Sequence, residues 1–170
     1  ESELLSNLID DAPHLYIARR LNEDPSSPWF QLIKYNEQST SSPKRRTSLR
    51  MMQRSINQLL GKIKTINIET NELYKIISNF WKAIQIIFKK EWGDHRHHLL
   101  TKGLGVNSLT MLLADIILNY NVKNVSIQRF KEILSPLKNI DWRSDGMFAS
   151  FGGHKGSIEV YKKLKGLIII

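Results

Sequence analysis

Two long stripes of apolar residues at helical spacing determine which class of fold this chain can adopt. In the first, from Leu73 to Phe88, apolar side chains recur every three or four positions, and lysines occupy the opposite side. Thr70 or Asn71 is placed to cap its start. The second stripe, from Leu109 to Tyr120, has Asn107 or Ser108 as its cap. Such stripes are typical of amphipathic helices that bury one face in a core.

Capping and breaking residues predict further helices. One helix is predicted to start at Asp11-Ala12-Pro13. A second starts at Thr47 or Ser48 and ends near Gly61. A third starts at Ser126 and is shortened by Pro136. Leu4–Ile9 and Ser157–Lys165 are predicted as short terminal helices. Only Thr65–Ile68 alternates like a strand, and it is too short to form a sheet alone. The predicted fold is therefore all-α, with about six to seven helices.

At 170 residues the chain is expected to form a single compact domain. Its predicted parts are N-terminal helices (1–22), a loop with a basic end (23–47), helices (48–92), a loop marked by glycines 103 and 105 (93–108), and C-terminal helices (109–170). The chain has no cysteine, which excludes thiol catalysis and cysteine-ligated metal sites. No apolar run is long enough for a membrane span, and the lack of cysteine is compatible with a cytosolic setting. Because the first residue is Glu1, we expect a fragment of a longer protein.

The net charge of +9 is unevenly distributed along the chain. Residues 1–37 carry seven acidic and three basic residues, whereas residues 38–68 carry seven basic residues and no acidic one. Residues 69–170 carry fifteen basic and nine acidic residues. An uninterrupted basic segment favours a polyanionic partner, although it also fits a solvated basic face or one that contacts the acidic head.

The basic segment supplies the candidate nucleic-acid contacts. Arg46, Arg50 and Arg54 follow one another at intervals of four, so a helix beginning near Ser48 would align three guanidinium groups that can bind successive phosphates. The full set of candidate DNA-contacting residues is Lys44, Arg45, Arg46, Arg50, Arg54, Lys62, Lys64 and Lys155.

Two other polar groups have both a functional and a structural interpretation. Asp94, His95, His97 and His98 include metal-ligating residue types, but their spacing matches no closed zinc or iron motif, and a polar loop is the favoured interpretation. The run Gly152-Gly153-His154-Lys155-Gly156-Ser157 could bind a phosphate at a helix start, but it lacks the full P-loop pattern and is favoured as a tight turn. The four tryptophans are expected in the core. We assign no catalytic residue, metal site or cofactor.

Several short motifs, in order along the chain, resemble those of DGQHR-domain proteins, the family that includes DndB-like DNA-modification proteins. They are Ala18-Arg19-Arg20-Leu21-Asn22, Ser27-Pro28-Trp29, the aromatic helix ending at Trp92, Leu99 to Gly105, Asp141-Trp142, and Phe151 to Gly156 with Glu159 and Val160. The Asp-Gly-Gln-His-Arg motif that names the family, in a ParB-like α/β part, is absent. The resemblance implies that these residues are the helical C-terminal half.

The resemblance further implies a bacterial or archaeal cytoplasmic protein linked to DNA modification by phosphorothioation and to transcriptional regulation. We therefore expect a non-catalytic helical domain that contacts the DNA backbone. The alternative is an assembly module that packs on the ParB-like half or on a second copy, without touching DNA. A third interpretation, part of an ATPase or nuclease, requires chemistry that lies upstream.

Overall fold

The computed structural model describes residues 9–35, 46–120 and 125–170. Within these ranges the elements are α2 (Pro13–Glu23), β1 (Ile33–Lys34), β2 (Thr47–Ser48), α3 (Leu49–Lys62), α4 (Thr70–Ile87), α5 (Lys89–Gly93), the 3-10 helix η1 (His95–His97), α6 (Gly103–Tyr120), α7 (Ile127–Leu134), the 3-10 helix η2 (Ser135–Leu137) and α8 (Gly153–Lys165). The all-α prediction is confirmed. The two strands form a short parallel pair with Ile33 opposite Thr47.

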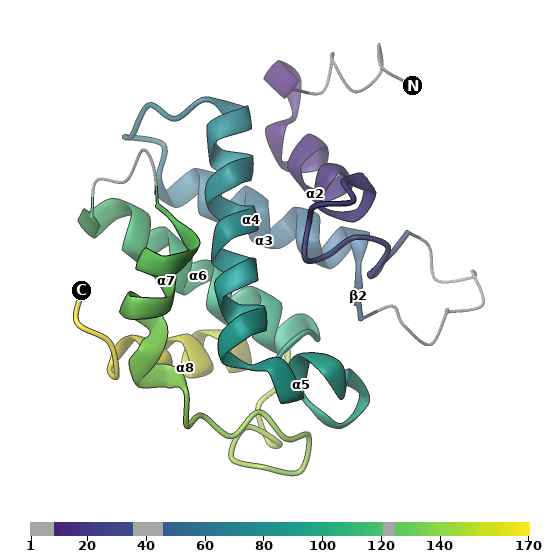
Figure 1. The fold of residues 1–170 in the computed structure, drawn as a ribbon, viewed down its shortest axis with the longest axis vertical. Coiled ribbons are helices and arrows are strands. Elements are labelled where there is room, and N and C mark those ends of the chain that lie inside the picture. Colours follow the sequence, from purple (N-terminus) through teal and green to yellow (C-terminus); the bar gives the residue numbers. More distant parts are fainter. Residues whose placement is uncertain (1–8, 36–45, 121–124) are drawn as a thin grey trace.

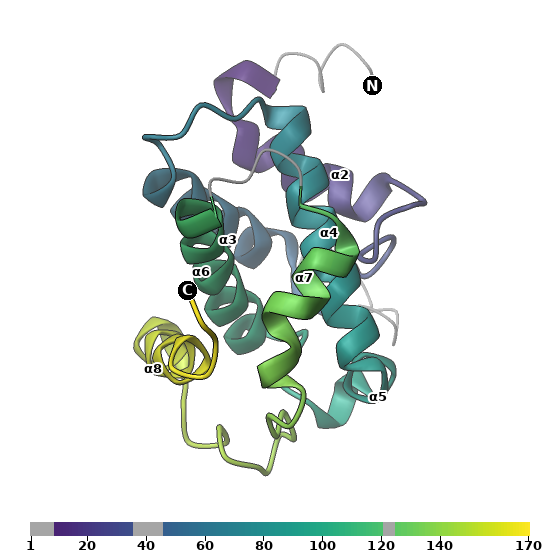
Figure 2. The same cartoon turned by 60° about the vertical axis from the view of Figure 1, so that its left-hand side comes forward.

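Helix α6 lies at the centre of the helices (Figures 1 and 2). Helices α3 and α8 pack directly against it, α2 packs on α3, and α4 packs along α7. Viewed as in Figure 1, α4 and α7 are in front, whereas α3 and α6 lie behind them. Most of α6 is buried, including both Leu112 and Leu113. This central helix therefore holds the α3 and α8 surfaces in fixed positions relative to each other.

Within the described residues, α6 is the one helix that is long and apolar enough to cross a membrane. Of its 18 residues, 61% are buried inside the domain, so this helix serves as part of the core. Aromatic side chains complete this core. Trp29 meets the edges of Trp81 and Trp92, with ring centroids 5.2 Å apart in each pair, and Trp142 contacts Phe148 at 5.4 Å. The four tryptophans are buried, as predicted.

Two predicted caps are confirmed by hydrogen bonds. The Ser48 side chain accepts a bond from the Met51 backbone N–H at 3.1 Å, which begins α3. The Ser126 side chain likewise accepts from the Arg129 N–H at 3.1 Å and begins α7. Pro136 lies in η2, directly after α7, and so shortens that helix as expected.

The predicted cap of α4 was wrong, because the candidate side chains bind elsewhere. The N-cap residue is Glu69, without a side-chain cap bond. Thr70 Oγ1 instead donates to the Ile9 carbonyl at 3.2 Å, and Asn71 Oδ1 accepts from Arg20 at 2.9 Å. Both side chains thus join α4 to the N-terminal part of the fold.

The predicted loop 93–108 was wrong in its second half, because α6 begins at Gly103. Gly105 is helical, and its backbone packs so closely that an added Cβ would lie 2.0 Å from the Leu100 carbonyl oxygen. Asn107 and Ser108 lie inside the helix and do not cap it; the Ser108 hydroxyl donates to the Leu104 carbonyl at 2.7 Å. Glycine here permits close packing and does not mark a turn.

Two smaller predictions also differ from the structure. Helix α8 begins at Gly153, four positions before the predicted Ser157, and Gly153 has a positive φ of 62° that glycine tolerates at the entry. The predicted loop 23–47 contains β1 and the start of β2, whereas Thr65–Ile68 forms no strand, in agreement with the prediction that it is too short to form a sheet alone. The predicted helix Leu4–Ile9 lies almost entirely outside the described residues.

Candidate nucleic-acid interface

Helix α3 presents an exposed basic edge. Arg50 and Arg54 are exposed, while the opposite side of the helix, including Met52 and Ile56, is buried against the rest of the domain. No acidic residue occurs anywhere in α3. The four-residue interval between the two arginines corresponds to about 6 Å of rise, so both guanidinium groups lie along one side of the helix. Arg50 and Arg54 thus occupy the row that their spacing predicted.

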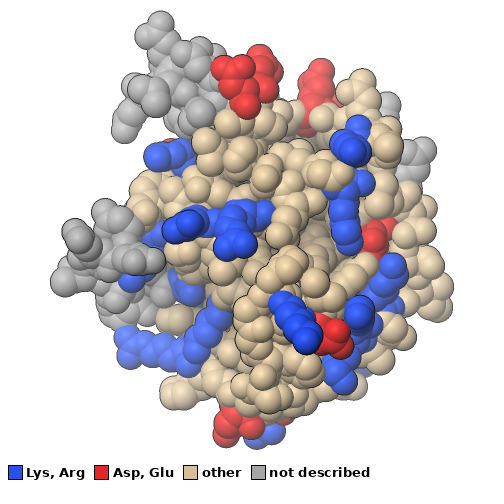
Figure 3. Space-filling view, turned by 180° about the vertical axis from the view of Figure 1, so that it is seen from behind, with Lys and Arg blue, Asp and Glu red and all other residues tan. Residues whose placement is uncertain are grey.

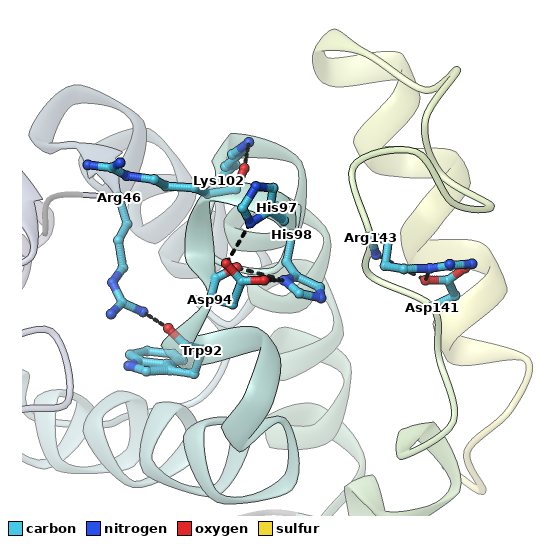
Figure 4. A network of polar contacts seen from close by, with 9 residues as sticks. Arg46, Trp92, Asp94, His97, His98, Lys102, Asp141 and Arg143 are labelled. Atoms are coloured by element: carbon cyan, nitrogen blue, oxygen red, sulfur yellow. Dashed lines mark hydrogen bonds and ion pairs between the residues drawn. The ribbon is translucent and has the colours of Figure 1, made fainter. Parts of the chain in front are cut away.

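Arg46 does not continue this row, because it precedes α3 and is bound inside the fold. Its side chain is half-buried, Nη1 donates to the Trp92 carbonyl, and the guanidinium lies 5.2 Å from the centre of the Trp92 ring (Figure 4). Burial lowers the pKa of Arg46 from its usual value. The Arg46 backbone N–H also donates to the Leu32 carbonyl at 2.9 Å. Arg46 therefore ties the chain before α3 to α5.

The other basic candidates lie around the same part of the molecule, except for two that the structure does not describe. Lys62 is exposed in the last turn of α3, Lys64 follows in the next turn, and Lys155 is exposed in the first turn of α8. Lys44 and Arg45 lie outside the described residues. We call Arg50, Arg54, Lys62, Lys64 and Lys155 the basic surface.

Across the described ranges, none of the five residues of the basic surface forms an ion pair. The neighbouring acidic residues of α6 and α8 are already paired: Asp115 with Lys165 at 3.2 Å and Glu159 with Lys162 at 3.3 Å. From behind, with α3 and α6 toward the viewer, Lys and Arg side chains clearly outnumber Asp and Glu (Figure 3). This side of the molecule therefore carries uncompensated positive charge.

A second polar group joins α5 and η1 to the loop after η2 (Figure 4). His98 is buried, and its Nδ1 donates to the Asp94 carbonyl at 2.6 Å. The Asp94 carboxylate binds Nδ1 of the exposed His97 at 2.7 Å. His98 and Arg143 form an isolated antiparallel bridge, next to a backbone bond from Leu99 N–H to the Trp142 carbonyl at 2.7 Å. We call residues 92–99 and 141–144 the histidine corner.

The electrostatics of the histidine corner are local and paired. The hydrogen bond from His97 lowers the pKa of Asp94. Arg143 donates to both carboxylate oxygens of Asp141, at 2.9 and 2.8 Å, and lowers the pKa of Asp141 to about 2. Over the described part of the chain, no group of three His, Asp or Glu side chains is arranged to hold a metal ion. Each of these side-chain pairs lies within one chain segment, and the two segments are joined by the backbone hydrogen bonds from Leu99 N–H to the Trp142 carbonyl and from Ser144 N–H to the His97 carbonyl.

Sequence reasoning missed a groove between α3, α6 and α8. Its larger part has a volume of about 490 Å³ and a mainly apolar lining that includes Leu59, Met111 and Ile158. Its smaller part, of about 230 Å³, has a mixed lining of polar residues such as Arg54 and Asn107 and apolar ones such as Met51 and Leu104. Gln58 and His154 line both parts, so we treat them as one groove.

The groove was hard to predict because its lining comes from three separate helices. Within α8 alone, His154, Ile158 and Tyr161 recur at helical intervals, a mixed polar and apolar face that was the available signal. Tyr161 also donates a hydrogen bond to Asp115. The pKa of Tyr161 is raised, mainly because the side chain is partly buried and secondly because of this hydrogen bond. Lys62 lies 4.9 Å from the centre of the Tyr161 ring, and both Lys62 and Arg54 line the groove, so two members of the basic surface also belong to it.

No protein-family model, curated protein or solved structure matches this chain. The resemblance to DGQHR-domain proteins accordingly stays a prediction from short sequence motifs.

Proposed function

We propose that this domain binds DNA through the phosphate backbone, using the basic surface of α3 and α8. The observation that carries the proposal is the exposed edge of α3, where Arg50 and Arg54 have no acidic partner in the described ranges and no acidic residue in their own helix. Grouped like charges of this kind repel one another in the free protein, and a polyanion relieves that repulsion.

The dimensions of the surface suit a nucleic-acid backbone. From Arg50 to Lys62, α3 rises by about 18 Å, which is long enough to follow several phosphates. Arg guanidinium groups bind phosphate oxygens through two parallel hydrogen bonds, whereas lysines contribute mobile point charges. Lys155 extends the surface onto α8, whose N-terminal turn has no side-chain cap and adds favourable partial positive charge.

Contacts of this type hold DNA without reading its sequence, because phosphates are common to every base pair. The proposal is therefore a non-catalytic domain that supplies affinity and orientation. Within the DGQHR resemblance, it would serve a cytoplasmic protein concerned with DNA modification and transcriptional control, and the ParB-like half would add the remaining function.

The direct test is fluorescence anisotropy with a labelled DNA duplex at fixed, low salt. The variant Arg50→Gln, Arg54→Gln, Lys155→Gln should bind at least about 30-fold more weakly than the unaltered chain, because three phosphate contacts are lost. Arg46 is kept, since it packs against Trp92. The matched control, Lys75→Gln, Lys89→Gln, Lys138→Gln, removes the same charge from exposed positions on other elements and should bind nearly normally. Equal losses in the two variants would contradict a defined surface.

An assembly role is the second candidate, and one observation favours it. Leu118, Tyr120, Leu167 and Ile169 are large apolar residues that remain exposed, and the Tyr120 hydroxyl donates to the Ile169 carbonyl at 2.8 Å. The end of α6 and the C-terminal residues thus form an apolar patch suited to another copy or to the ParB-like half. Sedimentation velocity tests self-association: a concentration-dependent dimer that Leu118→Ser with Ile169→Ser abolishes would support it.

A further inference from the structure

We propose that the groove between α3, α6 and α8 binds a small amphipathic carboxylate, with its apolar chain in the larger part and its carboxylate in the smaller part. The larger part has the volume of an ordinary ligand pocket, about 490 Å³. Leu59, Met111, Ala114 and Ile158 line it, so an apolar chain entering it leaves water.

The polar groups lie where a head group would meet them. The smaller part adjoins the larger one through Gln58 and His154, and it is lined in addition by Arg54, Asn107 and Ser157. Arg54 provides a fixed positive charge, and the Gln58 and Asn107 amide groups provide neutral donors, whereas the Ser157 hydroxyl already donates to the Gly153 carbonyl at 3.1 Å. The hydrogen bond from Ser55 to Asn107 joins the walls of the two parts. An elongated ligand can therefore extend from one part into the other.

The charge around the groove selects an anion over a cation. The acidic residue beside the larger part is Asp115, which accepts hydrogen bonds from Tyr161 and pairs with Lys165 at 3.2 Å. Lys62, by contrast, lies 4.9 Å from the centre of the Tyr161 ring and forms no ion pair among the described residues. With Arg54 at one end, Lys62 at the other and Asp115 neutralised, a cationic ligand would be repelled and an anionic one attracted.

Methyl NMR of the full chain labelled at the methionine methyl groups tests the proposal, because the four methionines report on different places. Met111 lines the larger part and Met51 the smaller part, whereas Met52 is buried in the core and Met147 is exposed in the loop before α8. The probes are octanoate, 1-octanol and octylammonium. Octanoate should shift the Met111 and Met51 signals to saturation and bind about tenfold more tightly than octylammonium.

Two variants separate the parts of the groove. Ile158→Trp fills the apolar part and should abolish the response to octanoate and octanol together. Arg54→Gln leaves the apolar part intact, so octanol should still bind, while the preference for octanoate should fall to about twofold or less. Because Arg54 is exposed, the Arg54→Gln variant should fold normally, so the test remains decisive even if Ile158→Trp does not fold.

Three results would overturn the proposal. The first is an unchanged Met111 signal at millimolar octanoate, and the second is equal binding of octanoate and octylammonium. The third is a Met111 signal that depends on protein concentration without any ligand, which would mean that a second copy of the chain occupies the groove. None of these readouts involves DNA, so failure here is distinct from failure of the proposed function.

Discussion

The histidine corner and the basic surface both concentrate charged side chains, but they differ in whether those charges have partners. In the histidine corner, Asp94 binds His97, Asp141 binds Arg143, and the adjoining Arg46 donates to the Trp92 carbonyl. On the basic surface, Arg50 and Arg54 form no ion pair within the described residues. Charges that are already paired stabilise the local fold, whereas charges left exposed and unpaired are available to a second molecule.

The largest expected effect comes from two glycines that lie near these two regions. In Gly105→Ala the new Cβ would lie 2.0 Å from the Leu100 carbonyl oxygen, next to the histidine corner, and the chain should lose about 3 kcal/mol of folding free energy or fail to fold. In Gly61→Ala, on the open side of α3, nothing lies within 4 Å, and the helix should gain roughly 0.5 kcal/mol. Urea unfolding measures both, and equal effects would contradict the difference in packing.

The second-largest expected effect distinguishes Arg46, which is bound inside the fold, from Arg50, which is exposed. Arg46→Met should lower the free energy of unfolding by about 2 kcal/mol, because the hydrogen bond to Trp92 and the contact with its ring are lost. Arg50→Met should change it by less than about 0.5 kcal/mol, since this side chain is exposed. DNA affinity should respond in the opposite way, falling for Arg50→Met and holding for folded Arg46→Met. If the two variants changed stability and DNA affinity alike, Arg46 would not be a structural residue distinct from the DNA-binding Arg50.

The smallest expected effect is a pH dependence confined to the histidine corner. The Asp141 carboxyl has a pKa of about 2 in the folded chain, below its ordinary value of 3.8, because Arg143 stabilises the charged form. Its contribution to stability is therefore complete above pH 3.8 and is lost as the pH falls toward 2. Asp141→Asn should flatten the fall of the urea midpoint over this interval. If the urea midpoint of Asp141→Asn fell with pH as steeply as that of the unaltered chain, the Asp141–Arg143 pair would not contribute to acid stability.

The fold class could be predicted because its main signal is local. The stripes from Leu73 and from Leu109, and the caps Ser48 and Ser126, act within a few residues of where they stand. The start of α6 was missed because Gly105 marks a close approach to Leu100, and glycine in a sequence does not distinguish a turn from a tight contact. A parallel pair as short as β1 and β2 has no periodicity to detect.

The candidate site was predicted only where its signal is local in the sequence. Arg50 and Arg54 follow from helical spacing, since both lie within α3. The role of Arg46 depends on Trp92, which is 46 positions away, and no local pattern indicates that contact. The groove was not predicted, because its lining residues Gln58, Met111 and His154 lie on three different helices. They become neighbours only when these helices pack together.

If the basic surface binds DNA phosphates, it releases the counterions condensed on them. The most direct measurement is the slope of log K against log salt for duplex DNA, taken for the unaltered chain and for the Arg50→Gln, Arg54→Gln, Lys155→Gln variant. Each phosphate contact contributes about −0.9, so the slope should be about −3 to −5 and should become shallower by about 2 to 3 in the variant. A slope near zero for the folded chain, or an unchanged slope in the variant, would contradict the account.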